Sequence, residues 1–240
     1  MQLIMKLLKL NILQTINQFK IHDKLNPQLW DKKTLKEDVF NSIMSYVDMF
    51  IKDKKVTTKI EDIILIGSSC DVNYNKNSDI DVHLIVDLDE ESDEYSNIIA
   101  LCKLWNINNT IKIHNHTVEV NPQNKNNKDI SMNAAMYSLK HKKWLREPTY
   151  NFKITPKMKE EIAIKCVELI NTAHSHYKKK DGDSLKELLS TIKDERKEGV
   201  RVNGEMDISN LVFKTLRNHG CITEWEDRIA KFRIIEPLTI

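Results

Sequence analysis

Glycine and proline are scarce in this sequence, with five of each among 240 residues. Flexible linkers, low-complexity segments and collagen-like repeats need far more of both, so the sequence excludes a protein built mainly from them. Cysteine is also rare, and no two of the four form a Cys-x-x-Cys pair or share zinc-finger spacing with histidine. We expect reduced, mostly buried thiols, as in cytoplasmic proteins. The four are Cys70, Cys102, Cys166 and Cys221.

Long hydrophobic runs and a large charge of one sign are missing as well. No stretch approaches the length of a membrane-spanning helix, which excludes a membrane span. The apolar run over residues 1–10 is broken by Lys6 and Lys9 and precedes no small-residue cleavage site, so we expect a short amphipathic helix instead of a signal peptide. The net charge of +2 produces no overall field that attracts nucleic acid. A cytoplasmic globular protein is the expectation.

Hydrophobic periodicity changes character near residue 150. Before that point the order of elements predicts an α/β (α+β) domain, a mixed sheet with flanking helices. Thr34 and Glu37 form a capping box that should begin the first helix. Residues 129–146 fit either a helix or a short pair of strands. The other expected elements are helices over 34–51 and 95–105 and strands over 60–66, 79–86 and 111–120.

After residue 150 the periodicity is helical only. Thr155 and Pro156 should begin a first long helix. A second is expected to be capped by Ser184 and Glu187 and to end at Gly199, and a third covers 208–216 and stops near Gly220. Thr223 and Glu226 should cap a fourth. The expected organisation is an N-terminal segment over 1–33, an α/β domain over 34–150 and a C-terminal helical domain over 151–240.

The chemically informative segment begins where the strand 60–66 ends, at Gly67-Ser68-Ser69. Asp79-Ile80-Asp81 follows twelve residues after Gly67, inside an apolar strand. Side chains alternate along a strand, so Asp79 and Asp81 should share a face. Two neighbouring carboxylates repel each other unless a cation lies between them, and such hard oxygen ligands suit Mg²⁺. Because glycine lets backbone amides approach a phosphate closely, the segment predicts a site for a nucleoside triphosphate and its metals.

This pattern resembles the DNA polymerase beta-type nucleotidyltransferase superfamily. Its signature is an apolar strand, Gly-Ser or Gly-Gly, a polar gap of similar length, and Asp-x-Asp or Asp-x-Glu between apolar residues. Within the superfamily, the chain resembles a subgroup of uncharacterised predicted nucleotidyltransferases of tailed bacteriophages, which would place it in the host cytoplasm. Besides the core motif, the similar segments are 25–30, 137–139 with Trp144, and 210–217.

The resemblance implies a metal-dependent nucleotidyltransferase with a third acid on a later strand, for which Glu119 is the best match. The Asn121-Pro122 pair that follows departs from the unbroken strand of the family. The implied cofactor is a pair of Mg²⁺ ions, with Mn²⁺ as an alternative. A nucleoside monophosphate would pass from a nucleoside triphosphate (NTP) to an acceptor hydroxyl with release of pyrophosphate. The sequence does not identify the acceptor, whether small molecule, protein or RNA, nor the oligomeric state. The implied catalytic and metal-binding residues are Asp79, Asp81 and Glu119, and the implied nucleotide-binding residues are Gly67, Ser68 and Ser69.

The same residues also have non-catalytic interpretations. The aspartates fit a solvated turn at a strand end, and Glu119 fits the exposed face of an edge strand. The basic stretch 140–146 fits substrate contacts by Lys140, Lys142, Lys143 and Arg146, or equally a solvated basic face with Trp144 in the core. For the whole chain, the alternative is a non-catalytic phage accessory or virion-associated protein that retains a nucleotide-binding fold. The spacing between Gly67 and Asp79 favours a catalytic role of the aspartates, and the complete acid pair favours the enzyme over the accessory protein.

Overall fold

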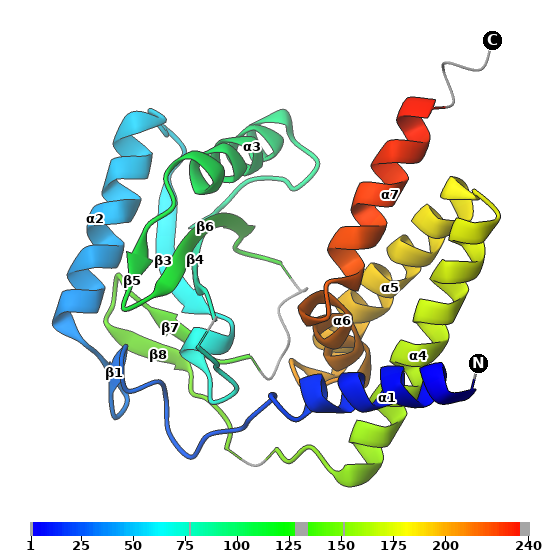
Figure 1. The fold of residues 1–240 in the computed structure, drawn as a ribbon. Coiled ribbons are helices and arrows are strands. Elements are labelled where there is room, and N and C mark those ends of the chain that lie inside the picture. Colours follow the sequence, from blue (N-terminus) through cyan, green and yellow to red (C-terminus); the bar gives the residue numbers. More distant parts are fainter. Residues whose placement is uncertain (1, 77, 128–133, 151, 236–240) are drawn as a thin grey trace. The chain divides into compact units, whose positions relative to one another are not determined.

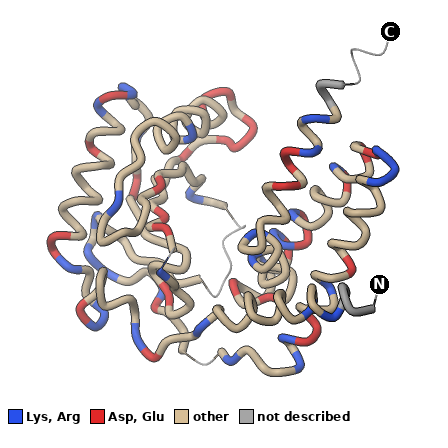
Figure 2. The backbone as a smooth tube through the Cα atoms, in the orientation of Figure 1, with Lys and Arg blue, Asp and Glu red and all other residues tan. Residues whose placement is uncertain are grey.

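A computed structural model describes residues 2–76, 78–127, 134–150 and 152–235 (Figure 1). The chain forms two compact units. Residues up to Phe19 and from Lys153 on belong to a helical unit, and the α/β unit lies between Lys20 and Phe152. The N-terminal segment expected over residues 1–33 is thus divided, its helix lying in one unit and residues 20–33 in the other. Acidic and basic positions are interspersed along both units (Figure 2).

A six-stranded mixed sheet forms the centre of the α/β unit, with the order β5-β6-β4-β3-β7-β8. Neighbouring strands run antiparallel except β4 and β6, which are parallel. The expected mixed α/β architecture is therefore confirmed. The strands are β3 (Ile60–Ile66), β4 (Ile80–Val86), β5 (Lys112–Ile113), β6 (His116–Asn124), β7 (Met136–Ser138) and β8 (Lys143–Arg146).

Helices α2 (Glu37–Asp53) and α3 (Asp93–Asn108) contribute many of the other core residues of this unit. The burial along β4 alternates as expected for a strand with one face on the core. Val82 and Leu84 are fully buried among apolar residues of both helices, such as Val47 and Trp105. The intervening residues of β4, among them Asp81, point to the opposite face of the sheet.

The first helix begins later than the capping box predicts. Thr34 and Leu35 form strand β2 (Thr34–Leu35), which pairs with β1 (Trp30–Asp31) across a tight turn. Lys32 has a positive φ of 53° in that turn. Thr34 is therefore used in a hairpin, and α2 starts behind Lys36, whose side chain has no acceptor for a capping hydrogen bond. The prediction that Thr34 and Glu37 form a capping box is therefore wrong.

The single strand expected over 111–120 is a hairpin instead. His114 and Asn115 both adopt positive φ, 48° and 70°, and turn the chain between β5 and β6. Strand β6 then continues through Asn121-Pro122 to Asn124, paired with β4 throughout. Of the two interpretations of 129–146, the strand pair is right for β7 and β8, while residues 129–133 lie outside the described part.

The side chain of Asn106, on α3, binds the outer edge of β6. Its Nδ2 donates to the carbonyl of Val120 at 2.9 Å, and its Oδ1 accepts from the amide of Val120 at 3.0 Å. The amide of Val118, two residues earlier on the same side, donates to the carbonyl of Ile111. Pro122 is two residues further and has no N–H to offer, so it is compatible with this edge position.

The helical unit contains α1 (Gln2–Ile16), α4 (Pro156–Lys178), α5 (Gly182–Asn203), α6 (Ile208–Asn218) and α7 (Cys221–Ile235). Their buried residues form one apolar cluster that includes Ile16, Ile162, Leu185, Leu211 and Trp225. None of the helices in the described part of the chain is long and apolar enough to cross a membrane. All four cysteines of the protein are free and buried, as expected.

The helix ends in this unit are predicted only in part. Thr155 caps α4 by accepting from the amide of Met158 at 3.2 Å, with Pro156 in the first turn, as expected. Asp181, and not Ser184, caps α5, by accepting from the amide of Ser184 at 2.9 Å.

Gly199 does not end α5 but lies inside it. A Cβ there would collide with Asp207 and Ser209 at the start of α6, so the close approach of α6 explains this glycine. The helix ends at Gly204, which has a φ of 88°. Helix α7 begins directly after Gly220, so the expected capping by Thr223 is also wrong.

Candidate functional site

Gly67 ends β3 in a conformation that excludes other residues. Its φ of 76° and ψ of −169° lie in a region that is essentially restricted to glycine. A Cβ at this position would lie 3.1 Å from Cγ of Asp81 and closer still to Oδ2. The backbone of Gly67 and the carboxylate of Asp81 are therefore in direct contact, and the 3₁₀ turn Ser68–Cys70 (η1) starts from this point.

Glu119 is brought to the same place by the sheet. Asp81 is the register partner of Ile66 on β3 and of Glu119 on β6. Residues directly opposite on adjacent strands share a face and lie about 4.8 Å apart along the hydrogen bonds. Asp81 and Glu119 are both partly exposed on the face away from α2 and α3. Asp79 lies one residue before β4 and is also partly exposed.

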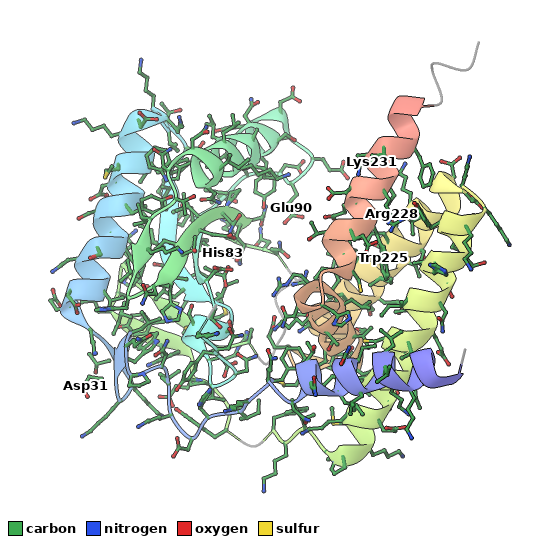
Figure 3. All side chains as sticks on the ribbon, in the orientation of Figure 1. Asp31, His83, Glu90, Trp225, Arg228 and Lys231 are labelled. Atoms are coloured by element: carbon green, nitrogen blue, oxygen red, sulfur yellow. The ribbon has the colours of Figure 1, made fainter. Side chains whose placement is uncertain are left out.

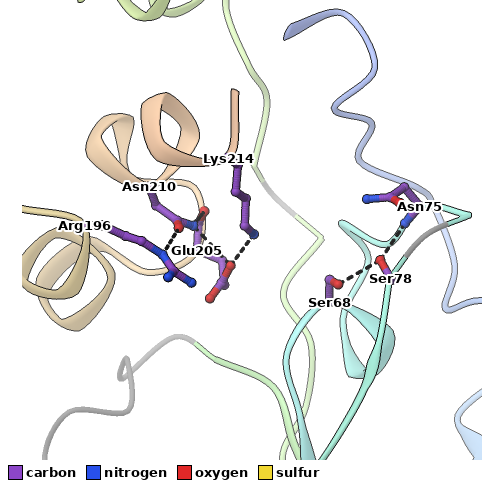
Figure 4. Close-up of polar contacts among 7 residues, drawn as sticks. All are labelled: Ser68, Asn75, Ser78, Arg196, Glu205, Asn210 and Lys214. Carbon is purple, nitrogen blue, oxygen red and sulfur yellow. Dashed lines mark hydrogen bonds and ion pairs between the residues drawn. The ribbon is translucent and has the colours of Figure 1, made fainter. Parts of the chain in front are cut away.

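The serine hydroxyls of the Gly67 turn have different surroundings. Ser68 is partly exposed, and its Oγ lies 2.8 Å from Oγ of Ser78 (Figure 4). Ser69 is only 3% exposed, and its carbonyl accepts from the indole Nε1 of Trp30 at 2.9 Å. Because its hydroxyl is inside the protein, Ser69 is a structural member of the turn, and Ser68 is the residue that can contact a phosphate.

Several residues that support the turn were not identified from the sequence. Ser78 is 5% exposed, and its Oγ also accepts from the amide of Asn75 at 2.9 Å. His116 contacts the carbonyl of Ser78, and Asn26 contacts His116. In the sequence, Asn26 and Trp30 were marked only by the similarity of segment 25–30 to the phage proteins. That similarity did not indicate that they contact His116 and Ser69.

His83 lies on β4 two residues beyond Asp81, and therefore on the same face of the sheet. Figure 3 labels this histidine within the α/β unit. Burial lowers the pKa of His83 to about 4, against a hydrogen bond with Gln123 Oε1 at 2.8 Å that raises it. The ring is therefore neutral at pH 7 and adds no positive charge beside the carboxylates. No role was assigned to His83 from the sequence, and its pairing with Gln123 explains it as a structural residue.

Two of the four expected substrate contacts lie away from Gly67. The Nζ of Lys140 donates to the carbonyl of Glu61 at 2.7 Å, near the start of β3, whereas Gly67 follows the end of that strand. Six residues of extended chain separate these points by about 20 Å. Lys142 lies 4.0 Å from the ring centre of Phe40 on α2. Neither lysine is brought to the carboxylates.

Lys143 and Arg146 lie on β8. Lys143 is exposed, and its register partner is Ser138. Arg146 pairs with Met136 at the Gly67 end of the sheet and donates to the carbonyl of Ala134 at 3.1 Å. Trp144 stacks on Trp30 at 4.9 Å and is partly buried, which fits the interpretation of this stretch as a basic face anchored by an aromatic residue.

The donor chemistry of Asp81 and Glu119 fits a magnesium ion, because carboxylate oxygens are its preferred protein ligands. Their shared register and face make them the pair that could hold the ion, with Asp79 nearest in sequence. Among the residues with described positions, no group of three or more His, Cys, Asp or Glu side chains is arranged to hold a metal. The complete three-acid site stays a prediction.

Comparison of the chain with family models, with curated proteins and with solved structures finds no match. The relation to the DNA polymerase beta-type superfamily therefore stays a prediction that depends on residues 67–81 and Glu119.

Proposed function

We propose that the α/β unit is a metal-dependent nucleotidyltransferase, which moves a nucleoside monophosphate from an NTP to an acceptor hydroxyl. The observation that carries the proposal is the contact between Gly67 and the Asp81 carboxylate, with Glu119 beside Asp81 in register. A triphosphate with its metal needs a backbone it can approach closely and hard oxygen donors within a few ångströms of it. Gly67 and the acid pair meet both requirements.

In this proposal Asp79, Asp81 and Glu119, the third acid, would hold Mg²⁺, and Gly67 with Ser68 positions the β- and γ-phosphates. When bound, Mg²⁺ would neutralise charge on the triphosphate and lower the pKa of the acceptor hydroxyl. Glu119 takes the hydroxyl proton. The acceptor oxygen forms a bond to the α-phosphorus, and the bond from that phosphorus to the bridging oxygen breaks. Pyrophosphate leaves with the bridging oxygen and its electron pair.

Calorimetric titration with each NTP, with and without Mg²⁺, tests the binding part of the proposal. We expect binding that requires Mg²⁺ and that weakens at least about tenfold in Asp81→Asn, which keeps the shape of the side chain and removes its charge. Asp87→Asn is the matched control, because Asp87 is exposed immediately after the same strand and pairs with Lys125. The control should change the affinity less than about twofold.

Incubation with α-labelled NTPs and fractionated host lysate tests transfer and searches for the acceptor. We expect labelled product from the wild type and a loss of about 10³-fold in Asp81→Asn, with an unchanged circular dichroism spectrum. NTP binding that ignores both the metal and Asp81→Asn, with no transfer to any fraction, would contradict the enzyme and favour the accessory protein.

A further inference from the structure

His116 is the most deeply enclosed polar side chain near the acid pair, at 2% exposure. It begins β6, three residues before Glu119. Its Nδ1 lies 2.6 Å from the carbonyl oxygen of Ser78. Since a carbonyl oxygen can only accept, Nδ1 must carry the hydrogen of this short bond.

The other ring nitrogen is held by the segment before β1. Nε2 of His116 lies 2.9 Å from Nδ2 of Asn26. The amide of Gln28 donates to Oδ1 of Asn26 at 3.0 Å, which fixes the Asn26 side chain with its NH₂ toward the ring. Nε2 therefore accepts from the NH₂ of Asn26, while Nδ1 donates to Ser78. Oε1 of Gln28 lies 3.1 Å from Nε2, and a half-turn of this terminal amide lets it donate as well.

Ser78 connects the ring to the turn at Gly67. Its amide donates to the carbonyl of Asn75, and its Oγ accepts from the amide of Asn75 and contacts Oγ of Ser68 (Figure 4). Ser78 is also the residue directly before Asp79. Ser78 thus lies between His116, which begins the strand of Glu119, and Ser68: its carbonyl contacts the His116 ring and its hydroxyl contacts Ser68.

We propose that His116 is a positioning residue, whose Nδ1–H holds Ser78 so that Ser68 and the aspartates face each other across the site. We call the hydrogen bond from His116 Nδ1 to the Ser78 carbonyl the clamp. Its role in catalysis rests on the proposed function, but its effect on the Ser78 segment can be measured without any ligand. In this proposal the ring has no direct role toward the phosphates or the metal. It acts through the Ser78 carbonyl and, from there, through the Ser78 hydroxyl.

Two substitutions separate the two ring nitrogens. In His116→Asn the side-chain NH₂ reaches the place of Nδ1 and can still donate to Ser78. In His116→Gln the amide reaches the place of Nε2, so the contact with Asn26 is kept and the donor to Ser78 is lost. Both replace a buried ring by a smaller amide, so their losses in melting temperature should be similar.

Hydrogen–deuterium exchange of the ligand-free protein is the first measurement. The amides of Cys70, Asp71, Asn75 and Ser78 are all hydrogen-bonded within the clamped segment. We expect exchange there to be about tenfold faster in His116→Gln and within about twofold of wild type in His116→Asn. If His116→Gln does not fold, Ser78→Ala replaces it, because loss of Oγ should release the Asn75 amide by a similar factor. Equal exchange in wild type and the variant measured would overturn the proposal, as would equal acceleration in the Asn and Gln variants.

The second measurement is NTP affinity in the presence of Mg²⁺. We expect about a tenfold loss in His116→Gln and less than twofold in His116→Asn, a difference that a purely structural role would not produce because both variants lose similar stability. A wild-type protein that binds no NTP would refute the proposed function, and the exchange result would still decide the clamp. Normal affinity in a folded His116→Gln would refute the positioning role.

Discussion

The carboxylate of Asp81 occupies the space in which any residue other than glycine at position 67 would place its Cβ. The backbone of Gly67 adds a second restriction, since its φ is 76°. The Gly67 turn and the Asp81 carboxylate therefore fit closely against each other, although Asp81 follows Gly67 by fourteen positions in the sequence. This fit makes position 67 the most sensitive point of the proposed site.

Gly67→Ala should weaken Mg²⁺-dependent NTP binding by at least about tenfold, because the new methyl group displaces the Asp81 carboxylate. The unfavourable φ should also cost about 1–3 kcal/mol of unfolding free energy. Calorimetric titration and urea unfolding measure the two effects.

Gly220→Ala is the control for the backbone cost. Gly220 has a φ of 84°, but a Cβ there meets no atom within 4 Å. It should lower stability in a similar way and leave NTP affinity unchanged. Unaltered binding by Gly67→Ala would show that the contact with Asp81 plays no part in the site.

Lys140→Ala should leave NTP affinity within about twofold of wild type. The lysine is exposed and donates to the carbonyl of Glu61 at the far end of β3, so its loss should cost no more than about 1 kcal/mol of stability. The same titration series measures this variant. A tenfold loss of affinity would show that Lys140 contacts the nucleotide, which would contradict its position at the far end of β3.

Glu205 should make the stability of the helical unit depend on pH. Burial by itself raises the pKa of its carboxyl, but the charge and hydrogen bond of Lys214, the hydrogen bond of Asn210 and the charge of Arg196 hold this pKa below its ordinary value (Figure 4). A depressed pKa in the folded state contributes stability above the unfolded pKa of about 4.3, and this is lost as the pH falls through the folded value.

Glu205→Gln should therefore cost about 1–2 kcal/mol at pH 7 and little at pH 3. Melting temperatures measured across this range, by a probe of the helical unit such as Trp225 fluorescence, give the comparison. Glu226→Gln is the control, since Glu226 forms an exposed ion pair with Lys193 and should cost less than about 0.5 kcal/mol at any pH. A constant penalty for Glu205→Gln between pH 3 and 7 would contradict the role of its charge.

The parts of the fold set by local periodicity could be predicted from the sequence. Strand β3 matches residues 60–66, because an apolar run rich in β-branched residues marks it, and β4, marked by two-residue alternation, differs from its prediction by one residue. The close approach of Gly67 and Asp81 follows from those two strands pairing antiparallel around a short loop. Asp81 and Glu119 fall in register because β6 lies parallel to β4, which no local pattern indicates.

The missed features depend on partners distant in sequence or on turn geometry. The alternation over 111–120 is continuous in the sequence, so nothing except Asn115, a residue that tolerates positive φ, indicates a turn. Once the turn is missed, His114 and His116 seem equivalent, whereas one is exposed beside Asp38 and the other is buried on Ser78. Trp30 and Asn26 bind groups 39 and 90 residues away, and only tertiary structure reveals those contacts.

The pairing of Asn106 with Val120 has a consequence for association between molecules. An open sheet edge is a template for strand addition and aggregation. Along the outer edge of β6, Val118 is bonded to Ile111, Val120 is bonded to an amide side chain that imitates a neighbouring strand, and Pro122 has no hydrogen to donate. Residues 118, 120 and 122 therefore have no amide hydrogen available to bond a strand of another molecule. The Asn106 side chain thus protects this edge of the sheet from strand addition.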